Sequence, residues 1–184
     1  MKQIIAIING INEWVGRFVG ILTLILAVVM LAIVVLRYGF SMSSVWLSES
    51  VIYLHGMIFM LGAAYTLKHN GHVRVDIFQR RYTQRQRAWV EIGGTVLLLW
   101  PVALFILIMS QPYVESAWRI MEGSREPGGI PFLYLLKTLL IVMPILLIIQ
   151  GLAEVLRAIQ VLQSPTPAVP NPNGEDSRHR EDGL

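Results

Sequence analysis

The sequence predicts an all-α integral membrane protein with four transmembrane helices. Hydrophobic residues make up 54% of its 184 residues and charged residues only 15%, against about 25% charged residues in an average soluble domain. Four long stretches contain no Asp, Glu, Lys or Arg: 18–36, 51–67, 92–114 and 138–153. The chain also lacks cysteine, which excludes a disulfide scaffold, thiolate metal sites and cysteine catalysis.

Each stretch predicts one span, because about 20 helical residues cross the hydrocarbon core. We expect spans at about 15–36, 45–67, 90–114 and 132–156, the last with Lys137 reaching toward the interface. Together they form a membrane domain over residues 1–162. The first stretch is longer than the hydrophobic region of a signal peptide and no A-x-A-like site follows it, so we expect an uncleaved first helix.

The distribution of basic residues predicts the orientation. Eleven of the 15 Lys and Arg residues lie before the first span, between the second and third, or after the fourth. The other four are Arg37, Arg119, Arg125 and Lys137. Since basic residues favour the cytoplasmic side, both termini are expected to be cytoplasmic.

Local signals predict the remaining elements in order. The isoleucine-rich start suggests an interfacial helix, and Thr83 with Gln86 resembles a capping box, so that the third span begins with a cytoplasmic extension. Pro101 and Pro144 predict kinks. Residues 126–131 predict a stiff turn, and the proline-rich and then charged residues 163–184 predict a disordered tail.

Small residues predict where helices approach each other closely. The second span contains Gly56, Gly62, Ala63 and Ala64, and the first begins with a Gly16 to Gly20 spacing. Small side chains let the backbones of membrane helices come together.

Several classes of function are excluded by what the spans lack. No charge-free stretch contains the carboxylate that a proton-coupled pump would need. Only His55 lies within a span, so paired haem ligands are missing, and no serine–histidine pair or acidic dyad can be placed there for proteolysis. The net charge of +3 is too small to indicate nucleic-acid binding. We therefore expect no enzyme, no cofactor and no resident metal.

Three residues near or within the spans are candidates for polar contacts. Arg37 ends the first span and Glu49 precedes the second on the same side. They are expected to form an ion pair, to face a partner subunit, or to be ordinary interfacial charges. His55 lies nearly two turns beyond Glu49. It is expected either to bond to a neighbouring helix or partner, or to relay protons.

The segment 68–76 combines a turn signal at Asn70-Gly71 with alternating charges and valines. We expect a short structured cytoplasmic loop, in which Arg74 and Asp76 pair locally or with a partner. A metal site made by His69, His72 and Asp76 is the alternative.

The order of these features resembles the small permease subunit of tripartite ATP-independent periplasmic (TRAP) transporters, the DctQ-like family. The matching residues are Arg37-Tyr38, Trp46-Leu-Ser-Glu49, Phe59-Met-Leu-Gly-Ala-Ala-Tyr-Thr-Leu67 and His72-Val-Arg-Val-Asp76. Gly128-Gly-Ile-Pro131, Leu136-Lys137 and Gln150-Gly151 resemble the mannitol/chloroaromatic-type branch. The resemblance extends from about residue 12 to 162.

The resemblance implies one of three components in a bacterial inner membrane. A periplasmic receptor would deliver an organic acid or similar solute to a large permease subunit, which carries it across in an elevator-type movement driven by sodium. The small subunit would pack beside the large one, among membrane lipid, and support its fixed scaffold. Arg37, Trp46 and Glu49 would lie on the receptor-facing side and His72, Arg74 and Asp76 at the cytoplasmic edge.

By this interpretation the chain acts through helix packing and buried polar contacts. Arg37, Glu49, His55 and Lys137 are the polar candidates for subunit contacts. Two alternatives remain: a self-associating four-helix channel or exporter, and a membrane anchor for a cytoplasmic enzyme.

Overall fold

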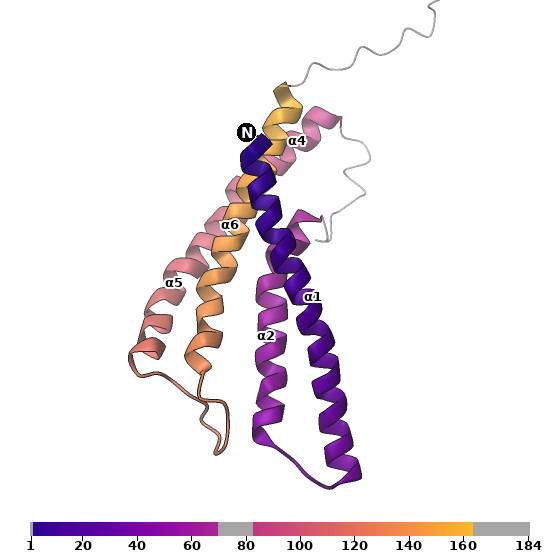
Figure 1. Cartoon of the computed structure of the whole chain (residues 1–184). Helices are drawn as coiled ribbons and strands as arrows, with labels where there is room; N and C mark the ends of the chain where they lie inside the picture. Colours follow the sequence, from indigo (N-terminus) through magenta and orange to yellow (C-terminus); the bar gives the residue numbers. More distant parts are fainter. Residues whose placement is uncertain (1, 70–82, 164–184) are drawn as a thin grey trace, which may run out of the picture.

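The computed structural model describes residues 2–69 and 83–163, which form helices joined by loops and contain no strand (Figure 1). The elements are α1 (Lys2–Gly39), α2 (Val45–Lys68), α4 (Gln84–Gly94), the π-helix η1 (Thr95–Leu99), α5 (Trp100–Arg119) and α6 (Leu133–Gln163). Because α4, η1 and α5 join into one run, four helices are long and apolar enough to cross a membrane. The predicted all-α, four-helix class is confirmed, and the predicted tail lies outside the described residues.

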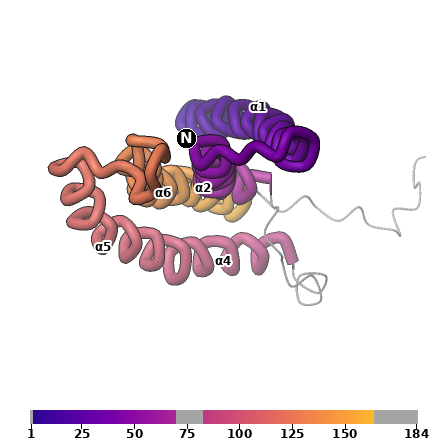
Figure 2. The backbone as a smooth tube through the Cα atoms, turned by 90° about the horizontal axis from the view of Figure 1, so that it is seen from below, coloured from indigo at the N-terminus to yellow at the C-terminus, as the bar shows by residue number. Residues whose placement is uncertain are grey.

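The helices are arranged as two hairpins that pack against each other through α2 and α6. Figure 1 shows α1 paired with α2, and α5 with α6. Seen along the helices in Figure 2, α2 and α6 lie in the middle, with α1 on one side and α4 and α5 on the other. The start of α1, the start of α4 and the end of α6 lie at what we name the terminal end. The segments 40–44 and 120–132 lie at the opposite end, named the loop end.

Side-chain caps define where two helices begin. Ser44 Oγ accepts a hydrogen bond from the Leu47 N–H at 3.5 Å, at the start of α2. At the start of α4, Thr83 Oγ1 accepts from the Gln86 N–H, and Gln86 Oε1 accepts from the Thr83 N–H at 2.9 Å. The predicted capping box is therefore confirmed, and α4 extends the third apolar helix beyond its charge-free stretch.

Helix geometry departs from the α form just before Pro101. An α-helical bond from residue 101 to the carbonyl of Leu97 would need an N–H that proline lacks. The turn before it is π-helical, and the Trp100 N–H bonds to the Thr95 carbonyl, five residues back. Pro144 is fully buried inside α6, and Pro112, which the sequence analysis did not single out, lies inside α5.

Several of the predicted small residues lie at close contacts between helices. A Cβ added to Gly16 on α1 would lie 2.0 Å from the ring of Tyr65 on α2, and one on Gly56 would lie 3.0 Å from Leu136 on α6. Ala64 has no exposed surface. Gly20, by contrast, faces open space, so only the first member of the Gly16–Gly20 spacing is used for packing within the chain.

The isoleucine-rich start forms no separate interfacial helix. It is the first part of α1, which runs unbroken from Lys2 to Gly39. Ile5, Ile8 and Asn12 are buried in it, and this part of α1 contacts the end of α6. The helix continues because no proline intervenes and because α6 is long enough to pack beside it.

Candidate functional site

The Glu49 carboxylate joins the two hairpins at the loop end. Glu49 lies in the first turns of α2, and its Oε2 accepts a hydrogen bond from the Ile130 N–H at 2.6 Å. Its Oε1 accepts a short hydrogen bond from the Ser124 hydroxyl. Tyr53, one turn further along α2, donates to the Ile130 carbonyl at 3.5 Å. One carboxylate of the first hairpin thus holds both ends of the 124–130 segment of the second. We name this set of contacts the Glu49 clasp.

The segment that the clasp holds is a compact turn. The Gly129 N–H bonds to the Glu126 carbonyl and the Ser124 N–H to the Ile130 carbonyl, both at 3.0 Å. Gly128 has φ +78°, which with a proline before it is typical of a type II turn. A Cβ on Gly129 would lie 2.7 Å from Glu49 Oε1, so the carboxylate approaches because position 129 has no side chain. The predicted turn is present, and the structure shows that Glu49 holds it in place.

Of the three alternatives considered for Arg37 and Glu49, the ion pair is not formed. Both carboxylate oxygens of Glu49 accept hydrogen bonds from the loop, and Arg37 is exposed without a described partner. Arg37 instead lines a cavity of about 30 Å³ with Ser44 and Ser48. Trp46, predicted on the same side, is 54% exposed.

Lys137 is paired within the chain. Its ammonium group lies 2.5 Å from Glu122 Oε2, with 11% of the lysine and 18% of the glutamate side chain exposed. It also lies 4.0 Å from the ring centre of Tyr113 on α5. Beside this pair, Trp118 Nε1 donates to the Thr138 hydroxyl at 2.9 Å. Lys137 therefore ties α6 to the end of α5, so that it does not simply extend toward the interface as a lone charge.

His55 lies on an apolar groove between α2 and α6. The groove has a volume of about 400 Å³, and its other lining residues are Val51, Ile52, Gly56, Met60, Leu136 and Leu139. His55 is exposed and makes no hydrogen bond with a described residue. Among the predicted polar residues, His55 is the one whose ring nitrogens make no hydrogen bond with a described residue while its neighbours are apolar.

A second polar cluster, at the terminal end, joins α1 to α6. Asn12 Nδ2 donates to Gln150 Oε1 at 2.8 Å, and Gln150 Nε2 donates to Glu154 Oε1 at 2.9 Å. Arg157 then bridges Glu154 and Asn9 Oδ1, at 3.0 and 2.8 Å. Asn12 and Gln150 have no exposed surface, so this cluster is the most deeply buried polar contact in the described part of the chain.

The same cluster reaches the end of α2. Lys68 Nζ lies 2.5 Å from Glu13 Oε2 and donates to the Asn9 carbonyl at 3.1 Å. His69 lies 3.9 Å from the same Glu13 oxygen and its ring packs on Tyr65, with centroids 4.2 Å apart. The helices α1, α2 and α6 are thereby held together at this end.

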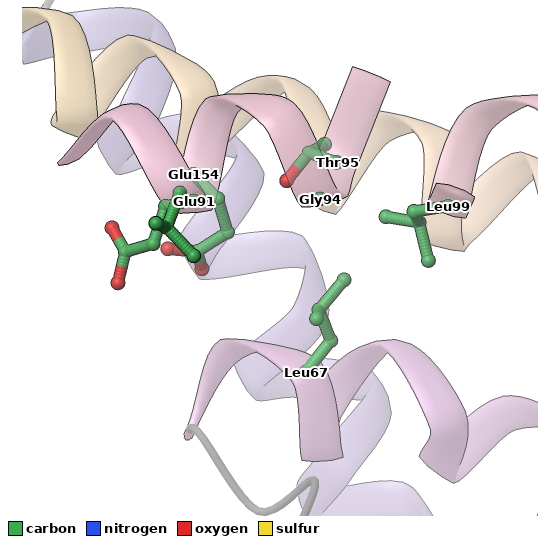
Figure 3. Close-up of a pocket in the computed structure, with 7 residues that line it drawn as sticks. Leu67, Glu91, Gly94, Thr95, Leu99 and Glu154 are labelled. Atoms are coloured by element: carbon green, nitrogen blue, oxygen red, sulfur yellow. The ribbon is translucent and has the colours of Figure 1, made fainter. Parts of the chain in front are cut away.

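A groove of about 230 Å³ opens beside this cluster, between α2, α6 and the α4–η1 junction (Figure 3). Glu91 and Glu154 lie toward one end of it and Leu99 toward the other. Glu154 is already engaged by Gln150 and Arg157. The described residues contain no group of three or more His, Cys, Asp or Glu that could hold a metal ion.

Three predicted residues cannot be placed, because His72, Arg74 and Asp76 lie outside the described residues. Of the alternative metal site only His69 is described, and it contacts Glu13 and Tyr65. The structure adds residues that the sequence analysis did not propose as contacts: Asn12, Glu13, Glu122, Ser124 and Glu154. No local signal singles out Asn12, because its partner is 138 residues away.

Comparison with known families gives one match. Residues 14–161 match the family described as "Tripartite ATP-independent periplasmic transporters, DctQ component". The match begins inside α1 and ends in the last turn of α6. It includes the Glu49 clasp and Gln150, whereas Asn9, Asn12 and Glu13 of the second polar cluster precede it. No curated protein and no solved structure matches the chain.

Proposed function

The chain belongs to the DctQ component family of tripartite ATP-independent periplasmic transporters, and from this premise we propose that it is a static support for the large permease subunit. As a member of the family it is the small component of a TRAP transporter, a multi-pass membrane protein and not an enzyme. The family implies association with a large permease subunit and a periplasmic receptor.

The observation that carries the proposal is the pair of polar clusters at opposite ends of the molecule. The Glu49 clasp joins the two hairpins at the loop end, and the Asn12–Gln150 contact joins α1 to α6 at the terminal end. Membrane helices gain little from apolar contact alone, because lipid is equally apolar, and buried polar contacts help to hold them together. Helices tied at both ends suit a fixed support better than a moving part.

The outward surfaces supply the contacts that such a support needs. In the most apolar window of each long helix, between 6% and 22% of the residues are buried. We propose that the large subunit covers part of this surface and lipid the rest. His55 is our candidate for a polar contact with the large subunit, with Arg37 and Trp46 on the receptor-facing side. Lys137, engaged with Glu122, serves this interface by holding α6 in place.

The finer assignment follows the resemblance described above. We propose a bacterial inner-membrane location with both termini cytoplasmic, supported by the basic residues at the terminal end. We also propose sodium-driven uptake of an organic acid or similar solute, and membership of the mannitol/chloroaromatic-type branch. Gly128-Gly-Ile-Pro131 and Gln150-Gly151 support this branch. Ile130 belongs to the Glu49 clasp and Gln150 to the second polar cluster.

The proposal is tested by co-purification. The chain carrying an affinity tag is expressed with a TRAP large permease subunit and receptor from the same source, extracted in detergent and analysed by size exclusion and mass spectrometry. We expect the large subunit in a one-to-one complex. A tag on an unrelated four-helix membrane protein is the control. A homogeneous oligomer of this chain alone would contradict the proposal and favour the self-associating channel or exporter. Capture of a cytoplasmic enzyme would favour the membrane anchor.

A further inference from the structure

The loop end presents charged side chains that are left without partners. Two pairs are formed there, Glu115 with Arg119 and Glu122 with Lys137. At the tip of the turn, the side chains of Arg125 and Glu126 are exposed and have no ionic partner among the described residues. They lie beside the Pro127–Gly128 turn, which is also exposed. A tip of this composition suits an aqueous protein partner, because unpaired charges are costly in hydrocarbon.

The tip is also held in one conformation from outside its own hairpin. The Ser124 hydroxyl and the Ile130 N–H both donate to Glu49 on α2, so the clasp brackets the exposed residues 125–128. The Glu126 N–H in turn donates to Ser124 Oγ at 3.0 Å. A loop that is ordered before binding loses less conformational entropy when a partner docks. These contacts therefore order the exposed residues 125–128 before any partner binds, in addition to connecting α5 to α6.

We propose that residues 124–130 form a docking element for the periplasmic receptor, in which Arg125 contacts an acidic group of the receptor. Glu49 is then a positioning residue, which holds the element in place without touching the receptor. The inference rests on the proposed function, since it takes the loop end to face the periplasm. It assigns to Glu49 an inward role that differs from the receptor-facing role expected from the sequence.

The test measures receptor binding separately from complex assembly. The complex of this chain with the large subunit is reconstituted in lipid nanodiscs and immobilised. Purified receptor carrying its solute is then titrated at about 0.15 M and about 1 M salt, because screening weakens exposed charge pairs. The variants are Arg125→Glu, Arg125→Lys and Glu49→Gln. Glu115→Gln is the matched control, since Glu115 is a loop-end carboxylate that pairs only on its own helix.

We expect Arg125→Glu to weaken receptor binding about tenfold at the lower salt and less at the higher, with Arg125→Lys close to the parent chain. Glu49→Gln should weaken receptor binding by several fold and lower the amount of co-purified large subunit much less, because the Asn12–Gln150 contact still joins α1 to α6. Glu115→Gln should alter neither quantity.

Three results would overturn the inference: no receptor binding to the parent complex, receptor binding by Arg125→Glu equal to that of the parent chain, or an equal loss of large subunit and receptor in Glu49→Gln. The Arg125 variants remain informative if Glu49→Gln fails to assemble, because Arg125 makes no contact that folding requires. The amount of large subunit recovered with the parent chain is measured before receptor is added. If none is recovered, the proposed function itself is contradicted.

Discussion

Asn12 on α1 donates a hydrogen bond to Gln150 on α6 at 2.8 Å, and neither side chain has any exposed surface. The two residues are 138 positions apart, so the contact connects the beginning of the first helix to the last. An amide pair buried among apolar helices is stabilising only while both groups stay paired, because an unmatched amide in this setting loses its hydrogen bond without regaining water.

Removing one amide should measure that contact. We expect Asn12→Ala to lower the free energy of unfolding in detergent by about 0.6–1.7 kcal/mol, the average and the maximum for hydrogen bonds between membrane helices. The double variant with Gln150→Ala should lose less than the sum of the two single changes. Thr23→Ala is the control, because Thr23 is exposed and bonds only to its own helix. Additive losses would show that the two amides do not interact.

Glycines 16 and 20 give a matched test of helix packing. Gly16→Ala should lower the free energy of unfolding by about 1–3 kcal/mol, because the new methyl group meets the Tyr65 ring at 2.0 Å and over-packing carries a cost of that size. Gly20→Ala meets nothing within 4 Å and should be neutral or stabilising, since alanine favours helix by about 1 kcal/mol. Equal effects at the two positions would contradict the α1–α2 packing described above.

The two ion pairs of the loop end should differ in strength. Lys137→Met leaves the Glu122 carboxylate without its partner, and we expect a loss of about 3 kcal/mol because only 18% of that side chain is exposed. Arg119→Met should cost about 1 kcal/mol or less, because the Arg119 and Glu115 side chains are 77% and 70% exposed. Thermal unfolding of the two variants, measured side by side, compares the two losses of stability. Equal losses would show that the first pair is as well solvated as the second.

His55 should matter for assembly more than for the fold. We expect His55→Leu to leave the unfolding midpoint within about 2 °C of the parent chain, since the imidazole makes no hydrogen bond with a described residue. The same variant should recover several-fold less large subunit. Met57→Leu is the control, because residue 57 points about 200° away around α2. Full recovery with His55→Leu would remove the histidine from the subunit interface.

Reversing Arg37 should affect the amount of transport and not its selectivity. Arg37 is exposed at the end of the first apolar stretch, at the loop end, so Arg37→Glu should lower uptake by cells that express all three components. The ranking of competing solutes should stay the same, because we expect the receptor to select the solute. A rise in uptake of one solute with a fall in another would place Arg37 in contact with the substrate path.

Prediction from the sequence was most successful where the signal is local. The charge-free stretches predicted the four long helices, because length and hydropathy are properties of a segment alone. The Thr83–Gln86 capping box was predicted from two residues three positions apart and is present as expected. The Gly16 and Gly56 approaches were also anticipated, although their partners, Tyr65 and Leu136, were not.

Prediction of contacts was less successful where one side chain could bond to several partners. Glu49 was considered with Arg37, the nearest opposite charge along the chain, but its oxygens accept from Ser124 and Ile130. The isoleucine-rich start was expected to form an interfacial helix that leads into the first span. It is instead continuous with α1, with Ile5 and Ile8 buried where α6 lies beside it and the other isoleucines exposed. Such choices depend on which helices are neighbours.

The sequence by itself therefore determined that this is a four-helix membrane protein of the DctQ type, since composition, periodic small residues and ordered motifs are written along the chain. Only the tertiary structure decided how the two hairpins are joined, by the Glu49 clasp at one end and the Asn12–Gln150 contact at the other. The physical reason is that a polar side chain in an apolar setting takes the partner that geometry brings within about 3 Å. That distance is set by the packing of helices remote in sequence.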